Sequence, residues 1–327
     1  MTSSPAPLLT LVVLAYRQAP LIDAAIASAL AQTGEPIEIL LSDDASPDDT
    51  FARMQAHAAA YRGPHQVIAR RNPVNLGLGE HVNTVMREAR GALVLLMAGD
   101  DLCLPERAQR VRAAWEATGR QADLVASHVI DMSLDGQDLG LLRVDDLAQW
   151  RGVADWARHR PHVIGAAHAV TRRLFDRFGP MAADCQLEDQ VNTLRALCAG
   201  GACTVDAPLL RYRRGGVSGR HVDADGAALR SRLQRVAQRH LALHRQWRRD
   251  AALAGCLDAV QAATDREEQR EQFLAALLAD PSRRPSLGLL WDRRFRVRTG
   301  WRLGKWLRVA FADLTVRLDA FKAQRRA

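Results

Sequence analysis

Acidic side chains occur in this 327-residue chain as short pairs whose types and spacing suit the binding of a cation and a phosphate group. The pairs are Asp43 with Asp44, Asp100 with Asp101, and Glu188 with Asp189, and the sequence Asn75-Leu76-Gly77 lies between the first two. The first two pairs and Asn75 close apolar or strand-like runs, where an α/β sheet presents side chains to a ligand. We therefore expect these carboxylates to converge on one crevice. Because Mg²⁺ and Mn²⁺ prefer carboxylate and phosphate oxygens, the pattern favours a metal-bridged, phosphate-bearing ligand.

Each acidic pair also has a structural explanation. The first pair precedes a predicted helix, and Asp is a common residue at the helix N-cap. The second pair precedes the next helix by several residues, which makes capping the weaker explanation there. The third pair opens a predicted helix, whose N-terminus stabilises a carboxylate anion, but the same position also suits a general base.

The segments that would position these pairs alternate between strands and helices. We predict strands over residues 8–14, 37–41, 66–69, 92–97 and 123–130, and helices over residues 20–33, 79–90 and 187–199 and from residues 47 and 105 onward. Ser46 as N-cap, with Asp49 at the capping-box position, would start the helix at residue 47. This alternation is typical of a doubly wound α/β sheet. Residues 133–160 are predicted to be irregular, and regular structure returns at 163–170.

Helical patterns dominate after residue 225. Apolar and aromatic side chains from Leu229 to Trp247 recur with the spacing of a heptad repeat. This pattern favours a helix packed on its own domain, and a homodimer through residues 229–247 is the alternative. Prolines at 281 and 285 interrupt the helical pattern, and another apolar helical face follows. We therefore divide the chain into residues 1–224, 225–282 and 283–327.

The net charge of +8 is concentrated at one end of the chain. Residues 283–327 hold 13 Lys or Arg and three Asp, a net charge of +10, which leaves −2 for residues 1–282. The near-neutral remainder argues against a nucleic-acid-binding core. Basic and aromatic residues alternate in the last segment, which fits either a helix at an anionic membrane surface or an amphipathic helix packed on its own domain.

The cysteines and the apolar runs bear on the compartment. Five cysteines without a CxxC pair favour reduced thiols in a cytoplasmic protein over a disulfide framework or a zinc site. The sequence contains no uninterrupted apolar run of about 18 residues, and no basic region precedes the short apolar run at residues 8–15. We therefore expect neither a spanning helix nor a signal peptide. The predicted location is the cytoplasm, with peripheral attachment to the inner face of the plasma membrane if the basic segment binds lipid.

The ordered set of motifs resembles family 2 glycosyltransferases over roughly residues 8 to 220. The matching segments are residues 31–33, 38–50, 75–77, 83, 89–91, 99–105, 172–175, 179–181, 188–189 and 212–214. Each motif alone is weak, but their order and spacing together are specific. The resemblance implies a GT-A fold, a nucleotide-diphosphate sugar as donor (a UDP-sugar most of all), a divalent cation (Mn²⁺ or Mg²⁺) and inversion at the anomeric carbon. A glycan or lipid-linked acceptor in bacterial surface polysaccharide assembly is the expected partner.

The resemblance also implies roles for individual residues. Asp189 would be the general base with Glu188 as its backup, and Asp100 would be the metal ligand with Asp101 beside it. The donor-binding residues would be Tyr16, Asp43, Asp44, Arg71, Asn75, Asp100 and Arg213. Among these, Asp44 would contact the base, with Tyr16 and Arg71 nearby. The segment 211–214 and the glycines at 215 and 216 would cover the diphosphate.

The sequence departs from the family pattern at three places. Ala98 occupies the first position of the DXD-type motif, where Asp is usual. Residues 15–18, Ala-Tyr-Arg-Gln, replace the usual Pro-x-Tyr-Asn, and Gly215 stands where a His often follows, with His221 as a possible substitute. These changes bear on the identity of the donor more than on activity.

Two other functions compete with this interpretation. Ala98 motivates a non-catalytic GT-A scaffold that binds a nucleotide sugar or a partner enzyme. A Rossmann dinucleotide enzyme is disfavoured because no GxGxxG follows the first strand. From position alone, residues 133–160, including Trp150 and Trp156, are predicted to select the acceptor.

Overall fold

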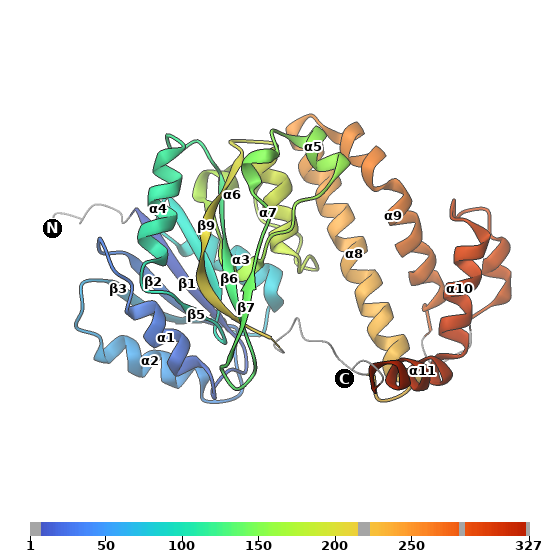
Figure 1. The fold of residues 1–327 in the computed structure, drawn as a ribbon, viewed down its shortest axis with the longest axis horizontal. Coiled ribbons are helices and arrows are strands. Elements are labelled where there is room, and N and C mark those ends of the chain that lie inside the picture. Colours follow the sequence, from blue (N-terminus) through green and yellow to red (C-terminus); the bar gives the residue numbers. More distant parts are fainter. Residues whose placement is uncertain (1–7, 215–222, 281–284, 325–327) are drawn as a thin grey trace. The chain divides into compact units, whose positions relative to one another are not determined.

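A computed structural model describes residues 8–214, 223–280 and 285–324 (Figure 1). Contacts divide the chain into two compact units, Met1–Gly219 with Arg249–Leu257, and Arg220–Arg248 with Asp258–Ala327. The three domains inferred from sequence, with boundaries at residues 224 and 282, stay a prediction.

The first unit is built on one mixed sheet. In the described part of the chain, its nine strands run in the order β3-β2-β1-β4-β8-β6-β9-β5, and β7 pairs with β6 (Figure 1). The strands are β1 (Leu9–Ala15), β2 (Glu38–Asp43), β3 (Gln66–Arg71), β4 (Leu93–Ala98), β5 (Leu102–Cys103), β6 (Leu124–Met132), β7 (Asp138–Leu142), β8 (His168–Thr171) and β9 (Ala202–Arg213). The first four strands pair in parallel, β1 with β2 and β4, and β2 with β3. In contrast, β8 is antiparallel to both β4 and β6. β1, β2 and β4 read as almost continuous apolar runs because they are buried on both faces.

The register of the parallel strands aligns their carboxyl ends. Ala15 lies opposite Asp43, and Asp43 lies opposite Arg71 on β3. On the other side of β1, Leu14 lies opposite Ala98, the last residue of β4. The loops after β1, β2 and β4 therefore start at one edge of the sheet, as predicted.

Helices cover both faces of this sheet (Figure 1). They are α1 (Ile22–Leu30), α2 (Thr50–Ala60), α3 (Gly77–Glu88), α4 (Arg107–Ala117), α5 (Val153–Arg158), α6 (Arg172–Phe178) and α7 (Glu188–Leu197). Short 3-10 turns occur at Leu147–Gln149 and Gly165–Ala167. α3, α6 and α7 meet over β8 and enclose a cavity of only about 10 Å³.

Two local predictions are wrong. α2 begins at Thr50 rather than residue 47, and Ser46 does not cap it. Instead, Oγ of Ser46 accepts the N–H of Arg17 (2.9 Å), and its N–H donates to Oδ2 of Asp43 (2.9 Å). Ser46 thus joins the loops after β1 and β2. Residues 133–160, predicted to be irregular, contain β7, a 3-10 turn and α5.

The second unit is helical, as predicted. It comprises most of α8 (Gly226–Ala254), nearly all of α9 (Leu257–Leu277), a 3-10 turn at Leu287–Trp291, α10 (Thr299–Ala310) and α11 (Ala312–Gln324). Its apolar core consists of Phe273, Leu277, Leu278, Leu290, Phe295 and Val309. Residues after 283 therefore supply half of this core. In the described residues, no helix combines the length and the apolar character that crossing a membrane requires.

The predicted heptad lies on α8. Leu229, Leu243 and Trp247 are buried within the single chain. This burial supports packing inside the chain, and a homodimer through residues 229–247 stays a prediction.

Candidate active site

The loops after β1, β2 and β4 are joined by main-chain hydrogen bonds. The N–H of Asp44 donates to the carbonyl of Ala15 (2.9 Å), and the N–H of Gly99 donates to that of Leu14 (2.8 Å). A Cβ atom on Gly99 would lie 2.3 Å from Oε1 of Gln18 and 3.0 Å from Cβ of Ala15, so Gly99 packs closely against the loop after β1. The first two acidic pairs therefore lie on interlocked loops.

Asp44 caps helix α3. Its Oδ1 accepts the N–H of Leu76 (2.9 Å) and an Nδ2–H of Asn72 (2.6 Å), and its Oδ2 accepts the N–H of Gly77 (2.9 Å). The first N–H groups of a helix lack partners within the helix, and this buried carboxylate satisfies two of them at α3. Asp44 thus has a structural role, and its contact with a nucleotide base stays a prediction.

Asp43 retains an oxygen that could bind a ligand. Oδ2 accepts the N–H of Ser46 and pairs with Nε of Arg71 (3.2 Å). Oδ1 is buried and has no hydrogen-bond partner among the described residues. An unpaired buried acceptor is costly, so a donor group from a ligand would stabilise it.

The remaining predicted donor-binding residues of this edge surround Asp43 and Asp44. The guanidinium of Arg71 donates to the carbonyl of Ser46 (2.6 Å). Nδ2 of Asn75 donates to the carbonyl of Asp44 (3.2 Å). Tyr16 is 41% exposed at the end of β1, with the Arg17 guanidinium over its ring, so its aromatic ring is accessible to a planar base.

Asp100 and Asp101 form a pair of poorly compensated carboxylates. Asp101 is only 1% exposed; its Oδ1 accepts the N–H of Arg213 (2.9 Å), whereas Oδ2 is buried with no partner in the described part of the chain. Burial, and then the charge of Asp100, raise the pKa of Asp101 to about 8. Burial also raises the pKa of Asp100, against the opposing effects of Arg213 and Gln18.

This pair fits a divalent cation. A cation beside Oδ2 of Asp101 would supply the positive charge that the protein does not, and phosphate and water would complete the coordination. Within the described residues, no group of three or more His, Cys, Asp or Glu side chains is arranged to hold a metal. A cation bound by Asp100 and Asp101 would therefore need further coordinating oxygens from a bound phosphate group and from water.

Arg213 holds the loop of this acidic pair through hydrogen bonds to main-chain carbonyls. Its Nε donates to the carbonyl of Asp100 (2.9 Å), and its Nη1 donates to the carbonyls of Leu134 (2.6 Å) and Ser133 (3.3 Å). Only 9% of Arg213 is exposed, so the structure gives it a positioning role in addition to its charge. Gly215, Gly216 and His221 lie outside the described residues.

Arg107 is a site residue that the sequence analysis missed. It is buried, and its Nη2 donates to the carbonyls of Leu96 (2.8 Å) and Ala166 (2.9 Å). Its charge favours the ionised form of Asp101. The sequence does hold one indication of this role. Arg107 lies four residues before Val111, on the apolar face of α4, where a charged residue is unexpected.

The third acidic pair is adjacent to this network. Glu188 and Asp189 form the first turn of α7, and a Cβ atom on Gly165 would lie 2.3 Å from Oε1 of Glu188. Arg107 holds Ala166, the next residue of the same 3-10 turn. The structure therefore brings the second and third pairs toward each other around that turn.

Burial and mutual repulsion act on both carboxylates of this third pair. Burial, and then the charge of Asp189, raise the pKa of Glu188 to about 8. Burial also raises the pKa of Asp189, partly opposed by the N–H of Gln190, which donates to its Oδ1 (2.7 Å). Such a pair shares a proton near neutral pH.

The two tryptophans predicted to select the acceptor differ in exposure. Trp156 is buried, so it cannot form an acceptor-binding surface, and that part of the prediction is wrong. Trp150 is half-buried, and its Nε1–H donates to the carbonyl of His159 (2.6 Å).

Comparisons with known proteins identify the family and the fold of this chain. The model of the family described as "Glycosyl transferase family 2" matches residues 10–179. The succinoglycan biosynthesis protein ExoO of Rhizobium meliloti (strain 1021) is 31% identical over 261 residues, which cover 74% of this chain and 73% of that protein.

Two solved structures share the fold. S. aureus TarS 1–349 in complex with UDP-GlcNAc has a TM-score of 0.53 at 14% identity and covers 96% of this chain and 92% of its own. The mannosyltransferase PcManGT from Pyrobaculum calidifontis, in complex with GDP-Man and Mn²⁺, has a TM-score of 0.51 at 20% identity and covers 94% of this chain and 87% of its own. The predicted GT-A fold, with its helical C-terminal part, is confirmed.

Proposed function

Because the chain belongs to glycosyl transferase family 2, we propose that it transfers a sugar from a nucleotide-diphosphate donor to a hydroxyl group of a glycan or lipid-linked acceptor. The observation that carries this proposal is the arrangement of the acidic pairs around one edge of the sheet. We expect a UDP-sugar as donor. The similarity to a succinoglycan biosynthesis protein supports a role in bacterial surface polysaccharide assembly.

The proposed reaction is a single displacement with inversion. Asp189 removes the proton from the acceptor hydroxyl, whose oxygen attacks the anomeric carbon of the sugar. The bond between that carbon and the diphosphate oxygen breaks on the opposite face, and the nucleoside diphosphate leaves with the electron pair. Glu188 can hold the proton that the pair shares, which leaves Asp189 ionised.

We propose that Asp100 and Asp101 hold Mn²⁺ or Mg²⁺, which would neutralise charge on the departing diphosphate. Oδ1 of Asp43 and the ring of Tyr16 are the proposed contacts to the nucleotide, with Arg71 and Asn75 nearby. Asp44 positions this loop through α3, and Arg213 positions the metal-binding pair.

Donor binding is tested by thermal unfolding with UDP, GDP, dTDP and CDP, each with and without Mn²⁺. One nucleotide with Mn²⁺ should stabilise the wild-type protein, by about 2.7 kcal/mol at 100 times its Kd. That corresponds to roughly 5–10 °C for a domain of this size. The Asp100→Ala variant should lose the shift, and Asp258→Ala on α9 should keep it.

Hydrolysis of the donor by the purified protein addresses the scaffold hypothesis. A scaffold would bind a nucleotide sugar but hydrolyse it no faster than the Asp189→Asn variant. Absence of a thermal shift with every nucleotide would contradict the proposed donor site. The replacement of the usual Asp by Ala98 would then be the first explanation to test.

We also propose that residues 283–327 attach the protein to an anionic membrane surface on the cytoplasmic side. Among the side chains described in this segment, large apolar ones are exposed along α10, α11 and the residue that joins them: Leu303, Leu307, Phe311, Leu314 and Leu318. The net charge of +10 in this segment complements anionic lipid. Exposed apolar side chains beside a basic surface are typical of interfacial helices.

Liposome binding tests this attachment. Deleting residues 283–327 should release the protein from anionic liposomes, but it also removes Leu290, Phe295 and Val309 from the core of the second unit. A double substitution, Leu314→Glu with Leu318→Glu, is therefore sharper. It should weaken binding to anionic liposomes at least about ten-fold, because burial of one leucine contributes about 1.5–3 kcal/mol.

The matched control for liposome binding is Leu139→Glu with Leu141→Glu, two exposed leucines on β7 of the first unit. This control should bind as the wild type does. Equal binding by both double variants would exclude α11 as the membrane contact.

A further inference from the structure

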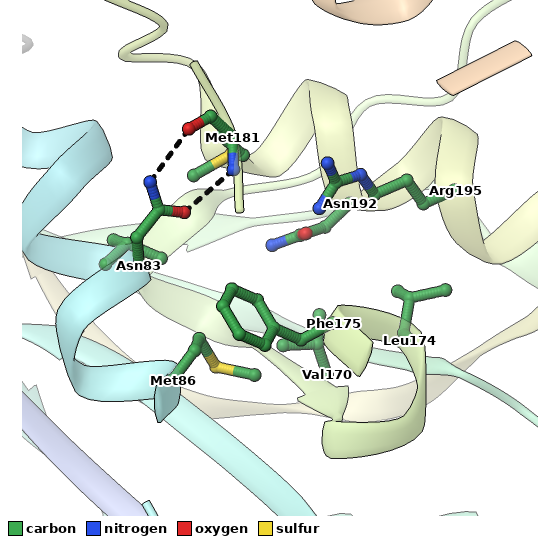
Figure 2. Close-up of a pocket in the computed structure, with 9 residues that line it drawn as sticks. Asn83, Met86, Val170, Leu174, Phe175, Met181, Asn192 and Arg195 are labelled. Atoms are coloured by element: carbon green, nitrogen blue, oxygen red, sulfur yellow. Dashed lines mark hydrogen bonds between the residues drawn. The ribbon is translucent and has the colours of Figure 1, made fainter. Parts of the chain in front are cut away.

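The segment that leads into α7 is held by a reciprocal pair of hydrogen bonds (Figure 2). Nδ2 of Asn83, on α3, donates to the carbonyl of Met181 (2.8 Å), and Oδ1 of Asn83 accepts the N–H of Met181 (2.8 Å). Asn83 is 0% exposed and Met181 is buried, so water cannot replace either bond. One side chain thus pairs with both main-chain groups of one residue, as a neighbouring β-strand would.

α3 contacts the same segment at a second point. A Cβ atom on Gly79 would lie 2.0 Å from the carbonyl oxygen of Cys185. Gly79 is one turn before Asn83, and Cys185 is four residues after Met181. The helix and the segment therefore run side by side in opposite directions, and this close approach requires glycine.

The other side of the segment is also fixed. Nη1 of Arg195, on α7, donates to the carbonyl of Gly179 (3.0 Å). Arg195 in turn makes a bidentate ion pair with Asp250 (2.7 and 3.1 Å), and both side chains are 1% exposed. Nη1 of Arg249 donates to the carbonyl of Pro180 (3.1 Å). The segment thus has fixed neighbours before Glu188 begins the helix.

Packing around the hydrogen bonds between Asn83 and Met181 leaves almost no free volume. Figure 2 shows the side chains of α3, α6 and α7 that surround the cavity of about 10 Å³, including Met86, Phe175 and Asn192. This space holds at most about one water molecule. A larger side chain at this position would therefore displace its neighbours, whereas a smaller one would leave the main-chain N–H and carbonyl of Met181 buried without their partners.

We propose that Asn83 is a positioning residue, which sets the place of the segment before α7 and thereby the orientation of Glu188 and Asp189. The proposal rests on the proposed function of this acidic pair. Asn83 is not a catalytic residue, because it contacts neither reacting group. Its two bonds reach a main-chain unit seven residues before Glu188, so losing them shifts the start of α7 rather than the donor loops.

Two variants test the proposal through different atoms. Asn83→Ala removes both hydrogen bonds, and Gly79→Ala displaces the segment while keeping them. Each should lower kcat for transfer about 10–100-fold, since misplacement of a catalytic group by about 1 Å costs on that order. The KM for donor and the thermal shift with nucleotide and Mn²⁺ should stay within about two-fold of wild type.

The control variant is Val111→Ala, which removes buried volume from α4. It should lower the unfolding temperature while kcat stays within about two-fold of wild type. Hydrogen exchange gives a readout that needs no activity: amides of residues 181–190 should exchange faster in both test variants and not in the control. Alkylation of the buried Cys185 thiol by iodoacetamide should accelerate in the same two variants.

The possible outcomes separate this proposal from the proposed function. Wild-type protein that transfers no sugar from any donor would overturn the function and, with it, the role of Asn83. Active wild-type protein with unchanged kcat in both test variants would overturn the positioning role alone. Slow exchange of residues 181–190 in Asn83→Ala would overturn it as well.

Discussion

Replacing Asp189 by Asn should lower kcat for sugar transfer by about 10²–10⁴-fold, the usual contribution of a general base. Asn has nearly the same shape as Asp but cannot take up the proton of the acceptor hydroxyl. Asp189 lies in the first turn of α7 and not on the loops that carry Tyr16 and Asp43, so nucleotide binding should persist. The measurement is single-turnover transfer at saturating donor, together with the thermal shift by nucleotide and Mn²⁺.

Glu188→Gln is the matched control for Asp189→Asn, because it changes the neighbouring carboxylate in the same way. This variant should retain activity and leave the acid limb of the pH profile in place, since Glu188 is still protonated and uncharged in the pH range where Asp189 ionises. If Glu188→Gln abolished transfer while Asp189→Asn retained it, the roles of the two residues would be exchanged.

The same control has a consequence for stability. The pKa of Glu188 is raised to about 8, so the folded protein keeps a proton that the unfolded chain releases near the ordinary glutamate value. Between those two pH values the folded state binds more protons, and the free energy of unfolding therefore falls as pH rises. Glu188→Gln should flatten this decline between about pH 4.5 and 8, which urea unfolding at several pH values would reveal.

Replacing Asp101 by Asn should abolish the Mn²⁺-dependent stabilisation by nucleotide without destabilising the protein in the absence of metal. Asn keeps an oxygen that accepts the N–H of Arg213. It also removes a buried carboxyl group whose Oδ2 has no partner in the described structure and whose ionised form is disfavoured by burial. The metal-free unfolding temperature should therefore match or exceed that of the wild type.

One further variant separates metal binding by Asp101 from support of the fold. Arg213→Met removes the guanidinium next to Asp100 and Asp101. This variant should have a lower unfolding temperature even without metal, because three main-chain carbonyls lose their donor. Asp101→Asn protein that still showed the full Mn²⁺-dependent shift would exclude Asp101 as a metal ligand.

The strand ends were predictable because buried parallel strands are continuous apolar runs, which the sequence displays directly. Residues 92–97 predict β4 almost to its ends, so Asp100 and Asp101 fall in the loop after it. β9 was missed because its pairing with β6 shifts register near His128, and Pro208 lies at that irregularity. A bulge and a proline both disrupt the alternation by which strands are recognised.

The roles of Arg107 and Asn83 could not be predicted from nearby residues. The carbonyl of Ala166, one of the two that Arg107 binds, lies 59 residues along the chain, and the carbonyl partner of Asn83 lies 98 residues away. Ser46 looked like a helix cap but is used by Arg17, 29 residues earlier. Capping was a correct alternative for the first acidic pair, but Asp44 caps α3 rather than the helix that directly follows it.

If Asp44 contacts the nucleotide base as predicted, its capping role restricts how donor preference could change over evolution or in engineering. A substitution chosen to suit another nucleotide would also leave the N–H groups of Leu76 and Gly77 without their acceptor. Loss of a cap alone costs about 0.5–2 kcal/mol of stability. In a mutant library at this position, stability would therefore decide which variants fold before their nucleotide preference could be compared. Tyr16 carries no such constraint at its exposed ring, and new donor preferences should arise there first.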